Sequence, residues 1–132
     1  MSEPSVIAAW HRLVEHGDLA ALHDLLAEDA VFHSPVVHTP QRGRALVERY
    51  LAAAFTVLVN PSFHYVREVV GERDAVLEFA VELDGLQVNG VDMLHWNDDG
   101  RIVDFKVMVR PLKAINLVHQ KMAAMLAAAT SG

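Results

Sequence analysis

The sequence predicts an α+β fold, because helical and strand patterns occupy separate stretches of the chain. Up to about residue 57 the apolar residues recur with the period of an amphipathic helix. Between residues 62 and 110 they alternate instead, and short turn sequences separate the alternating segments. Short connections place consecutive strands side by side and antiparallel. Helices that are segregated from such a meander must cover one face of its sheet.

Three helices and one strand are expected before the meander. The first helix is expected over residues 5–16, and Asp18 is expected to cap a second, short helix. A short strand is expected over residues 30–35, followed by a loop over residues 36–42. A third helix is expected from residue 43 to about residue 57, because its apolar residues again follow the helical period.

Four strands and a final helix complete the predicted order. The strands are expected at residues 62–70, 75–83, 86–97 and 101–110. Asp84 and Gly85 give the sharpest hairpin signal, because both tolerate the positive φ angles of tight hairpin turns. The last helix is expected from about Leu112 to Ala128, with Pro111 near its first turn.

Alternation assigns one row of each strand to the helix side of the sheet. Two strands supply unbroken apolar rows, Leu77, Phe79, Val81, Leu83 and Val103, Phe105, Val107, Val109. The strand between them supplies Val88, Gly90, Asp92, Leu94 and Trp96. Asp92 is the odd member of that row, and desolvation at such a position raises the pKa of a carboxyl group. Three interpretations stay open: Asp92 orients a ligand oxygen, it bonds a backbone N–H, or the row is exposed.

The composition excludes several classes of function. The chain has 132 residues, no cysteine and a formal net charge of −6. The absence of cysteine removes disulfides, zinc–thiolate sites, iron–sulfur clusters and cysteine nucleophiles. A nucleic-acid-binding protein normally carries a basic patch, and no run of lysine and arginine occurs. No apolar stretch is long enough for a membrane span, and no signal peptide is visible, so we expect a cytoplasmic protein without nucleic-acid or membrane partners.

The eight histidines give no recognisable metal-binding pattern. The sequence contains no pair with the HxH or HExxH spacing that places two rings on one side of a strand or helix. Ser34 follows His33, but adjacent strand residues point to opposite faces and therefore form no nucleophile–base pair. Glycine-rich nucleotide-binding motifs are also missing. We expect neither a metal nor a cofactor.

Several motifs, taken in order, resemble the NTF2-like superfamily, which includes ketosteroid isomerase, SnoaL-like polyketide cyclases, limonene epoxide hydrolase and scytalone dehydratase. They are Gly17-Asp18 before Leu22–Leu26, Glu28–Phe32, Gly43-Arg44, Gly90–Trp96 and Gly100–Ile102. The resemblance covers essentially the whole chain and implies one domain over residues 1–132. It implies a cone-shaped, bent antiparallel sheet wrapped round helices, as in a cystatin-like α+β barrel. It also implies a homodimer formed through the convex face of the sheet.

The resemblance gives Asp92 a specific role. Ketosteroid isomerases carry a protonated carboxyl group of the oxyanion hole at the matching position. Other positions of that machinery differ: Trp10 stands where the isomerase has its oxyanion tyrosine, and Ser34 stands where it has its general base. Leu26 and Leu51 replace the supporting tyrosines. The standard base and tyrosines are therefore not kept.

These observations predict an apolar ligand pocket with Asp92 as its main polar anchor. Asp92 would act as acid, base or oxyanion donor, assisted by His33 or Ser34. The expected pocket lining is Trp10, Phe32, Tyr50, Phe79, Val88, Phe105, Val107 and Val109. One interpretation is an isomerase-, cyclase- or hydrolase-like enzyme that acts on a small hydrophobic carbonyl compound. The alternatives are a non-catalytic module that binds a hydrophobic ligand and a dimerisation domain.

Overall fold

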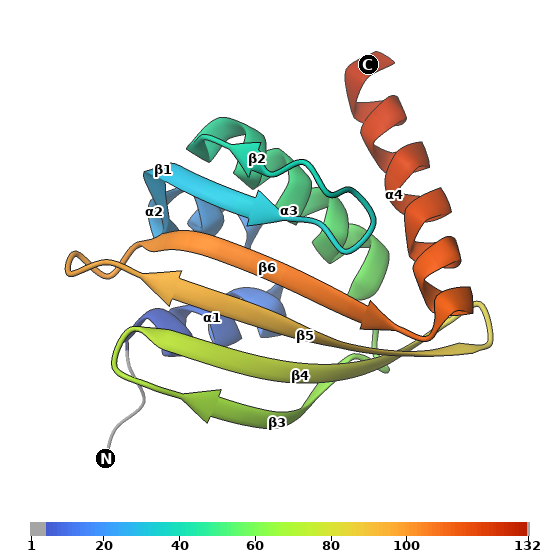
Figure 1. The fold of residues 1–132 in the computed structure, drawn as a ribbon, viewed down its shortest axis with the longest axis horizontal. Coiled ribbons are helices and arrows are strands. Elements are labelled where there is room, and N and C mark those ends of the chain that lie inside the picture. The colour runs from blue at the N-terminus through green and yellow to red at the C-terminus, as the bar shows by residue number, and fades with distance from the viewer. Residues whose placement is uncertain (1–4, 132) are drawn as a thin grey trace.

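The computed structural model describes residues 5–131 and places helices along one side of a curved sheet (Figure 1). The strands are β1 (Leu26–His33), β2 (Gln41–Arg42), β3 (His64–Val70), β4 (Asp74–Leu83), β5 (Leu86–Trp96) and β6 (Ile102–Arg110). The helices are α1 (Ser5–His16), α2 (Leu22–Leu25), α3 (Arg44–Leu58) and α4 (Leu112–Ser131), with a 3₁₀ turn at Leu19–Ala21. The ends of the predicted domain, residues 1–4 and 132, lie outside the described residues.

The six strands form one sheet in the order β2-β1-β6-β5-β4-β3. Strands β3 to β6 form the antiparallel meander that the alternating pattern predicts. Strand β1 instead runs parallel to β6, and β2 and β3 are the two edges of the sheet. The predicted α+β class is confirmed, and the sheet curves without closing into a barrel (Figure 1).

Helix α1 has the predicted bounds and packs one apolar face on the sheet side of the molecule. Its buried side chains are Val6, Ile7, Trp10 and Leu13. The helix ends at Gly17, whose φ of 65° lies in the left-handed region that glycine adopts without a Cβ clash. The N–H of Gly17 donates to the carbonyl of Leu13 at 2.9 Å, which satisfies one of the last helical carbonyls.

The segment between α1 and α3 differs from the prediction in three respects. Asp18 precedes the 3₁₀ turn, but its side chain makes no capping hydrogen bond. Strand β1 begins at Leu26 rather than at residue 30, because Leu26 pairs with Ile102 of the distant strand β6. The expected loop also contains the short strand β2, which pairs with β1. Pairing over long sequence separations is a tertiary interaction that local patterns do not report.

A β-bulge at Val103 shifts the alternation at the start of β6. Trp96 pairs with Ile102 and His95 pairs with Asp104, which leaves Val103 without a partner in β5. Ile102 is 0% exposed, whereas Val103 is only partly buried. The expectation that Val103 fills the inward row is therefore wrong, and Ile102 takes that position.

The predicted inward rows of β4 and β5 are confirmed by strictly alternating burial. Gly90 in β5 lies under the ring of Phe79, which explains why the row has no side chain there. A Cβ added at Gly90 would lie 2.5 Å from Phe79 Cζ and 2.6 Å from the carbonyl oxygen of Met108. Only glycine fits between these two groups.

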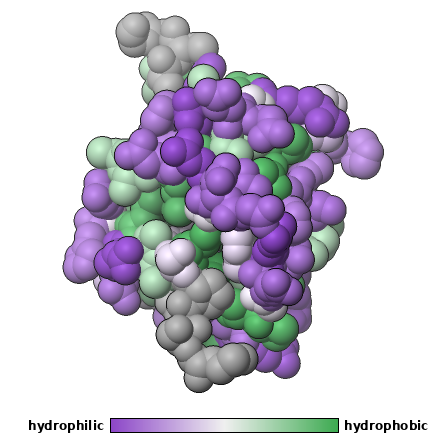
Figure 2. Space-filling model, turned by 90° about the vertical axis from the view of Figure 1, so that its left-hand side faces the viewer, coloured by the Kyte–Doolittle hydropathy of each residue, from purple (hydrophilic) through white to green (hydrophobic). Residues whose placement is uncertain are grey.

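The surface is mostly hydrophilic, with apolar side chains exposed in a few places. Figure 2 shows one end of the molecule, where hydrophilic residues form most of the surface and hydrophobic residues appear between them. The edge strand β3 exposes Val66, Val69 and Val70, and β6 exposes Met108. No helix among residues 5–131 is long and apolar enough to cross a membrane.

Candidate functional site

Asp92 is the one charged residue that is buried among those described, at 7% exposure. It lies in the inward row of β5, where it pairs with Leu77 of β4 on one side and Val107 of β6 on the other. Both neighbours are buried members of the core. The interpretation that Asp92 faces the interior is therefore correct, and the surrounding apolar side chains withdraw its carboxyl group from water.

A chain of two hydrogen bonds leads from helix α1 to this carboxyl group. Tyr65 of β3 donates its hydroxyl proton to Asp92 Oδ2 at 2.8 Å. Trp10 of α1 donates its indole N–H to the hydroxyl oxygen of Tyr65, also at 2.8 Å. The indole is only a donor, so Tyr65 accepts from Trp10 and its own proton is directed to Asp92.

Burial determines the pKa shifts of Asp92 and Tyr65 in this hydrogen-bond chain. Desolvation raises the pKa of Asp92 to about 7, although the hydrogen bond from Tyr65 lowers it in part. Desolvation and the neighbouring Asp92 carboxylate raise the pKa of Tyr65 well above its ordinary value. Tyr65 therefore keeps its proton at neutral pH, and Asp92 is the group that gains or loses one.

The two oxygens of Asp92 have different surroundings. Oδ2 accepts from Tyr65, whereas Oδ1 has no hydrogen-bond partner within residues 5–131. In the same part of the chain, no fully buried side-chain oxygen or nitrogen lacks a partner. Oδ1 is therefore not fully buried, and a water molecule can touch it despite the low exposure of the residue.

Tyr65 also borders a cleft of about 340 Å³ between α1 and β3, which brings the surface close to the hydrogen-bond chain. The cleft is lined by His11, Val14, Glu15, Phe63, His64, Tyr65 and Glu68. The ring of His11 packs on Tyr65 with centroids 5.8 Å apart, and His11 Nε2 lies 2.9 Å from Glu68 Oε2. The volume falls within the range of ligand pockets, about 300–1,000 Å³.

His33 does not join Asp92. It ends β1 and pairs with Lys106, whereas Asp92 pairs with the next residue of β6, Val107. Successive strand residues point to opposite faces, so His33 and Asp92 lie on opposite sides of the sheet. His33 Nε2 lies instead 2.9 Å from Asp104 Oδ1. The expected assistance of Asp92 by His33 is therefore not supported by this geometry.

Ser34 lies at the end of β1, where its Oγ accepts a hydrogen bond from the backbone N–H of Val36 at 3.1 Å. No hydrogen bond joins Ser34 to Asp92 within the described chain. A cavity of only about 20 Å³ beside it is lined by Phe32, Ser34, Pro35, Val36, Ala54, Leu58, Val107, Val118 and Met122. This space is too small for a substrate in the conformation that the structure shows.

The residues expected to line the pocket lie in or against the hydrophobic core. The buried ones are Trp10, Phe32, Phe79, Val88, Phe105 and Val107, and the partly buried ones are Tyr50 and Val109. The rings of Trp10 and Phe32 both pack on Phe105, with centroids 5.0 Å and 6.2 Å away. These side chains belong to the core on the helix side of the sheet, and Val107 among them pairs with Asp92.

Tyr65 is the important residue that local sequence patterns do not identify. Its signal is the aromatic alternation of Phe63 and Tyr65 at the start of β3. That strand is otherwise largely exposed, and its register shifts between Tyr65 and Arg67, so its inward row is hard to recognise.

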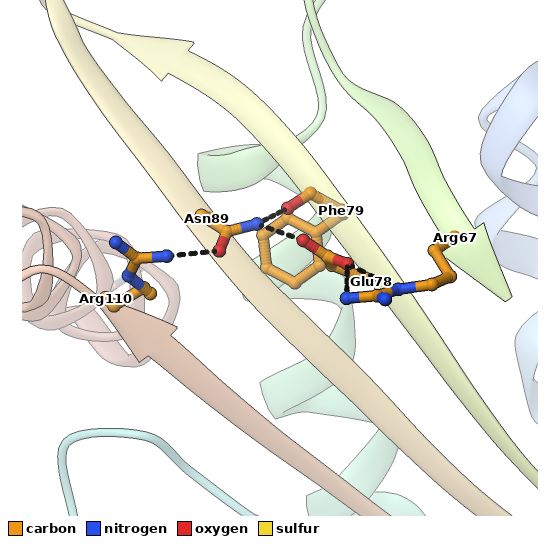
Figure 3. A network of polar contacts seen from close by, with 5 residues as sticks. All are labelled: Arg67, Glu78, Phe79, Asn89 and Arg110. Atoms are coloured by element: carbon orange, nitrogen blue, oxygen red, sulfur yellow. Dashed lines mark hydrogen bonds and ion pairs between the residues drawn. The ribbon is translucent and has the colours of Figure 1, made fainter. Parts of the chain in front are cut away.

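A second polar network lies on the sheet face opposite Asp92 (Figure 3). Asn89 donates to Glu78 Oε2 at 3.1 Å and to the carbonyl of Phe79 at 2.9 Å. Arg67 Nη2 lies 3.1 Å from Glu78 Oε1, and Arg110 donates to Asn89 Oδ1 at 3.4 Å. The bond from Asn89 is the largest cause of the lowered pKa of Glu78. These contacts connect β3, β4, β5 and β6, and therefore stabilise the sheet.

No group of three or more His, Asp or Glu side chains within residues 5–131 is arranged to hold a metal ion.

A family model described as a SnoaL-like domain matches residues 7–105. The chain therefore belongs to the SnoaL-like domain family, within the NTF2-like superfamily, and the resemblance in its motifs is confirmed.

Solved structures agree with this assignment. A steroid delta-isomerase from Pseudomonas aeruginosa is 38% identical, with a TM-score of 0.91 and coverage of 97% of this chain and 93% of that chain. An uncharacterized protein with a cystatin-like fold from Silicibacter pomeroyi is 33% identical, with a TM-score of 0.84 and coverage of 92% and 84%. The epoxide hydrolase/cyclase-like enzyme SalBIII shares the fold, at 22% identity, a TM-score of 0.64 and coverage of 80% and 88%. No curated protein matches significantly.

Proposed function

We propose that the protein is an isomerase- or cyclase-like enzyme that acts on a small hydrophobic carbonyl compound through Asp92. The observation that carries the proposal is the difference between the two oxygens of this buried carboxyl group. Tyr65 holds Oδ2, whereas Oδ1 has no partner among the described residues and is not fully buried. The similarity to the steroid delta-isomerase of Pseudomonas aeruginosa supports the reaction class.

In the proposed mechanism, the protonated carboxyl group donates a hydrogen bond from Oδ1 to the carbonyl oxygen of the ligand. A base from solvent, water or a buffer anion, takes a proton from the adjacent carbon while negative charge develops on that oxygen, and the protonated base then delivers a proton to the γ-carbon. Trp10 and Tyr65 fix the carboxyl group in advance. A preorganised donor in a water-poor site accelerates such a step by about 10²- to 10³-fold. Asp92 carries the donor proton below a pH of about 7.

The test is the conversion of a β,γ-unsaturated ketone into the conjugated enone, followed by absorbance. A ketosteroid and a small cyclic ketone are used as separate substrates. The wild type should convert at least one of them, and Asp92→Leu should lower kcat/KM by about 10²-fold or more. Wild-type kcat/KM should fall as the pH rises through about 7, because Asp92 then loses its donor proton.

Asp99→Asn is a matched control, since Asp99 is exposed in the turn between β5 and β6. This variant should leave kcat/KM unchanged. Equal kcat/KM values for the wild type and Asp92→Leu would overturn the role of Asp92. Saturable binding of the ketones without any turnover would instead identify a non-catalytic protein that binds a hydrophobic ligand.

We also propose that the outer face of the sheet mediates homodimerisation, as the family resemblance implies. Partly exposed Val76, Val91 and Met93 lie together there, because Val76 pairs with Met93 and Val91 pairs with Glu78. Sedimentation velocity should show a dimer for the wild type and a monomer for Val91→Asp. A wild type that sediments as a monomer at micromolar concentration would contradict this part of the proposal.

A further inference from the structure

A groove of about 500 Å³ lies where β1 ends beside β6, and Asp92 is not among the residues that line it. The last pairing of β1 with β6 joins His33 and Lys106, so the rest of β6 has a strand neighbour only on the β5 side. The segment after β1 forms the opposite wall. The lining is His33, Ser34, Pro35, Val37, His38, Pro40, Lys106, Val107, Met108 and Val109.

The walls of this groove are apolar and partly exposed. Met108 is 49% exposed and Val37 is 40% exposed, although both are large apolar side chains. Pro35 and Pro40 restrict the backbone of the wall that carries Val37, which lowers the entropy lost when a ligand binds. A ligand with an apolar body would remove this surface from water.

The groove's ionisable side chains are all basic, although the chain as a whole has a formal net charge of −6. Lys106 is partly buried and has no ion-pair partner within residues 5–131. His38 also makes no polar contact in that part of the chain. His33 Nε2 lies 2.9 Å from the carboxylate of Asp104, which is not among the lining residues. A partly buried ammonium group gains from an anionic partner.

From this combination we propose that the groove is a binding site for a small amphipathic carboxylate. The acid group would pair with the ammonium of Lys106, and the apolar body would lie against Val37, Met108 and Val109. The volume fits this class, because ligand pockets measure about 300–1,000 Å³ and are mostly apolar with a few polar anchors. Asp92 is not among the lining residues, so the proposal does not rest on the proposed enzymatic function. Lys106 and Met108 pair with Met93 and Val91 of the proposed dimer face, so the proposal requires that a dimer leave the groove open at the margin of that face.

The test uses octanoate as the probe, in calorimetric titrations of the 132-residue chain. Octanoate should bind the wild type saturably, and 1-octanol and octylammonium should bind at least about tenfold more weakly. Lys106→Gln should weaken octanoate binding by about tenfold or more, because a charge-assisted contact is lost. Lys113→Gln is the matched control, since Lys113 is exposed on α4 outside the groove, and it should bind octanoate like the wild type.

Methyl NMR locates the bound octanoate. The Met108 methyl signal should shift on titration, whereas the signal of Met122, which lines the small interior cavity, should stay unchanged. Equal affinity for octanoate and 1-octanol, or for wild type and Lys106→Gln, would overturn the proposal. The proposal would also fail if Lys106→Gln changed the oligomeric state of the protein but not its affinity for octanoate. The groove would then belong to an interface between copies of the chain.

Discussion

Tyr65 donates its hydroxyl proton to Asp92 across a strand that lies between them. Tyr65 belongs to β3 and Asp92 to β5, and β4 separates the two in the sheet. Neighbouring strands are about 4.8 Å apart, so β3 and β5 are about twice that distance from each other. Only a long side chain that leans over β4 can close the gap. The curvature of the sheet and the bond from Trp10 hold Tyr65 in that position.

Replacement of Tyr65 by phenylalanine should raise the pKa of Asp92 above its wild-type value of about 7. The hydrogen bond from Tyr65 stabilises the ionised carboxylate, so its loss favours the protonated form. NMR titration of carbon-13-labelled aspartate measures this pKa directly. Tyr50→Phe is the matched control, because Tyr50 has no hydrogen bond to Asp92, and it should leave the titration unchanged. An unshifted or lowered pKa in Tyr65→Phe would contradict the assignment.

The burial of Asp92 should make the protein less stable as the pH rises. The pKa is 3.8 in the reference state and about 7 in the folded protein, so between these values the folded state binds more protons than the unfolded state. The free energy of unfolding should therefore fall from about pH 4 to pH 7 and level off above it. The full effect is at most about 4 kcal/mol. Urea unfolding of Asp92→Asn should lack this fall, and parallel curves for both proteins would refute the prediction.

Gly90→Ala should destabilise the sheet where β4, β5 and β6 meet. The new Cβ would lie 2.5 Å from Phe79 Cζ and 2.6 Å from a backbone oxygen, and the latter cannot move without disturbing β6. We expect a loss of about 1–3 kcal/mol in the free energy of unfolding, as for other overpacked cores. Gly71→Ala serves for comparison, because its Cβ would lie 3.4 Å from the nearest atom. A similar small loss in both variants would show that the core yields more easily than its geometry indicates.

The bulge in β6 predicts unequal effects at two neighbouring positions. Ile102→Ala should cost about 2–5 kcal/mol, since Ile102 is 0% exposed in the core. Val103→Ala should cost less, because Val103 has no partner in β5 and is only partly buried. Chemical denaturation of both variants compares the two losses. The reverse order would mean that Val103 occupies the inward row, as simple alternation predicts.

Local patterns predict most of this fold because the elements of the meander are neighbours in sequence and in space. Alternation places Asp92 in a row of β5 that is otherwise apolar or glycine, which favours an inward position, and its burial in the structure decides among the open interpretations. Long-range pairing cannot be predicted in the same way. Strand β1 starts at Leu26 because Leu26 pairs with β6, and the residues next to Leu26 in sequence give no indication of that contact. The bulge at Val103 is equally invisible, because one extra residue leaves the apolar composition of the strand unchanged.

The polar partner of Asp92 could not be predicted for a related physical reason. The residues in register with Asp92 on the two neighbouring strands are Leu77 and Val107, and both are apolar. Tyr65 reaches Asp92 from two strands away, and that reach depends on how strongly the sheet bends. The sequence predicts His33 as a partner because it ends the first strand. The parallel register with β6 puts it on the other face.

The parallel pairing of β1 with β6 also determines the order in which the protein can fold during synthesis at the ribosome. Phe32 pairs with Phe105, so more than half of the chain must emerge before β1 meets its neighbour. Until then no strand pairs with β1 on its β6 side. The apolar residues of β1 stay exposed in the nascent chain, where chaperones can bind them. The meander can assemble hairpin by hairpin as it emerges, so completion of β6 is the event that joins the early and late halves of the protein.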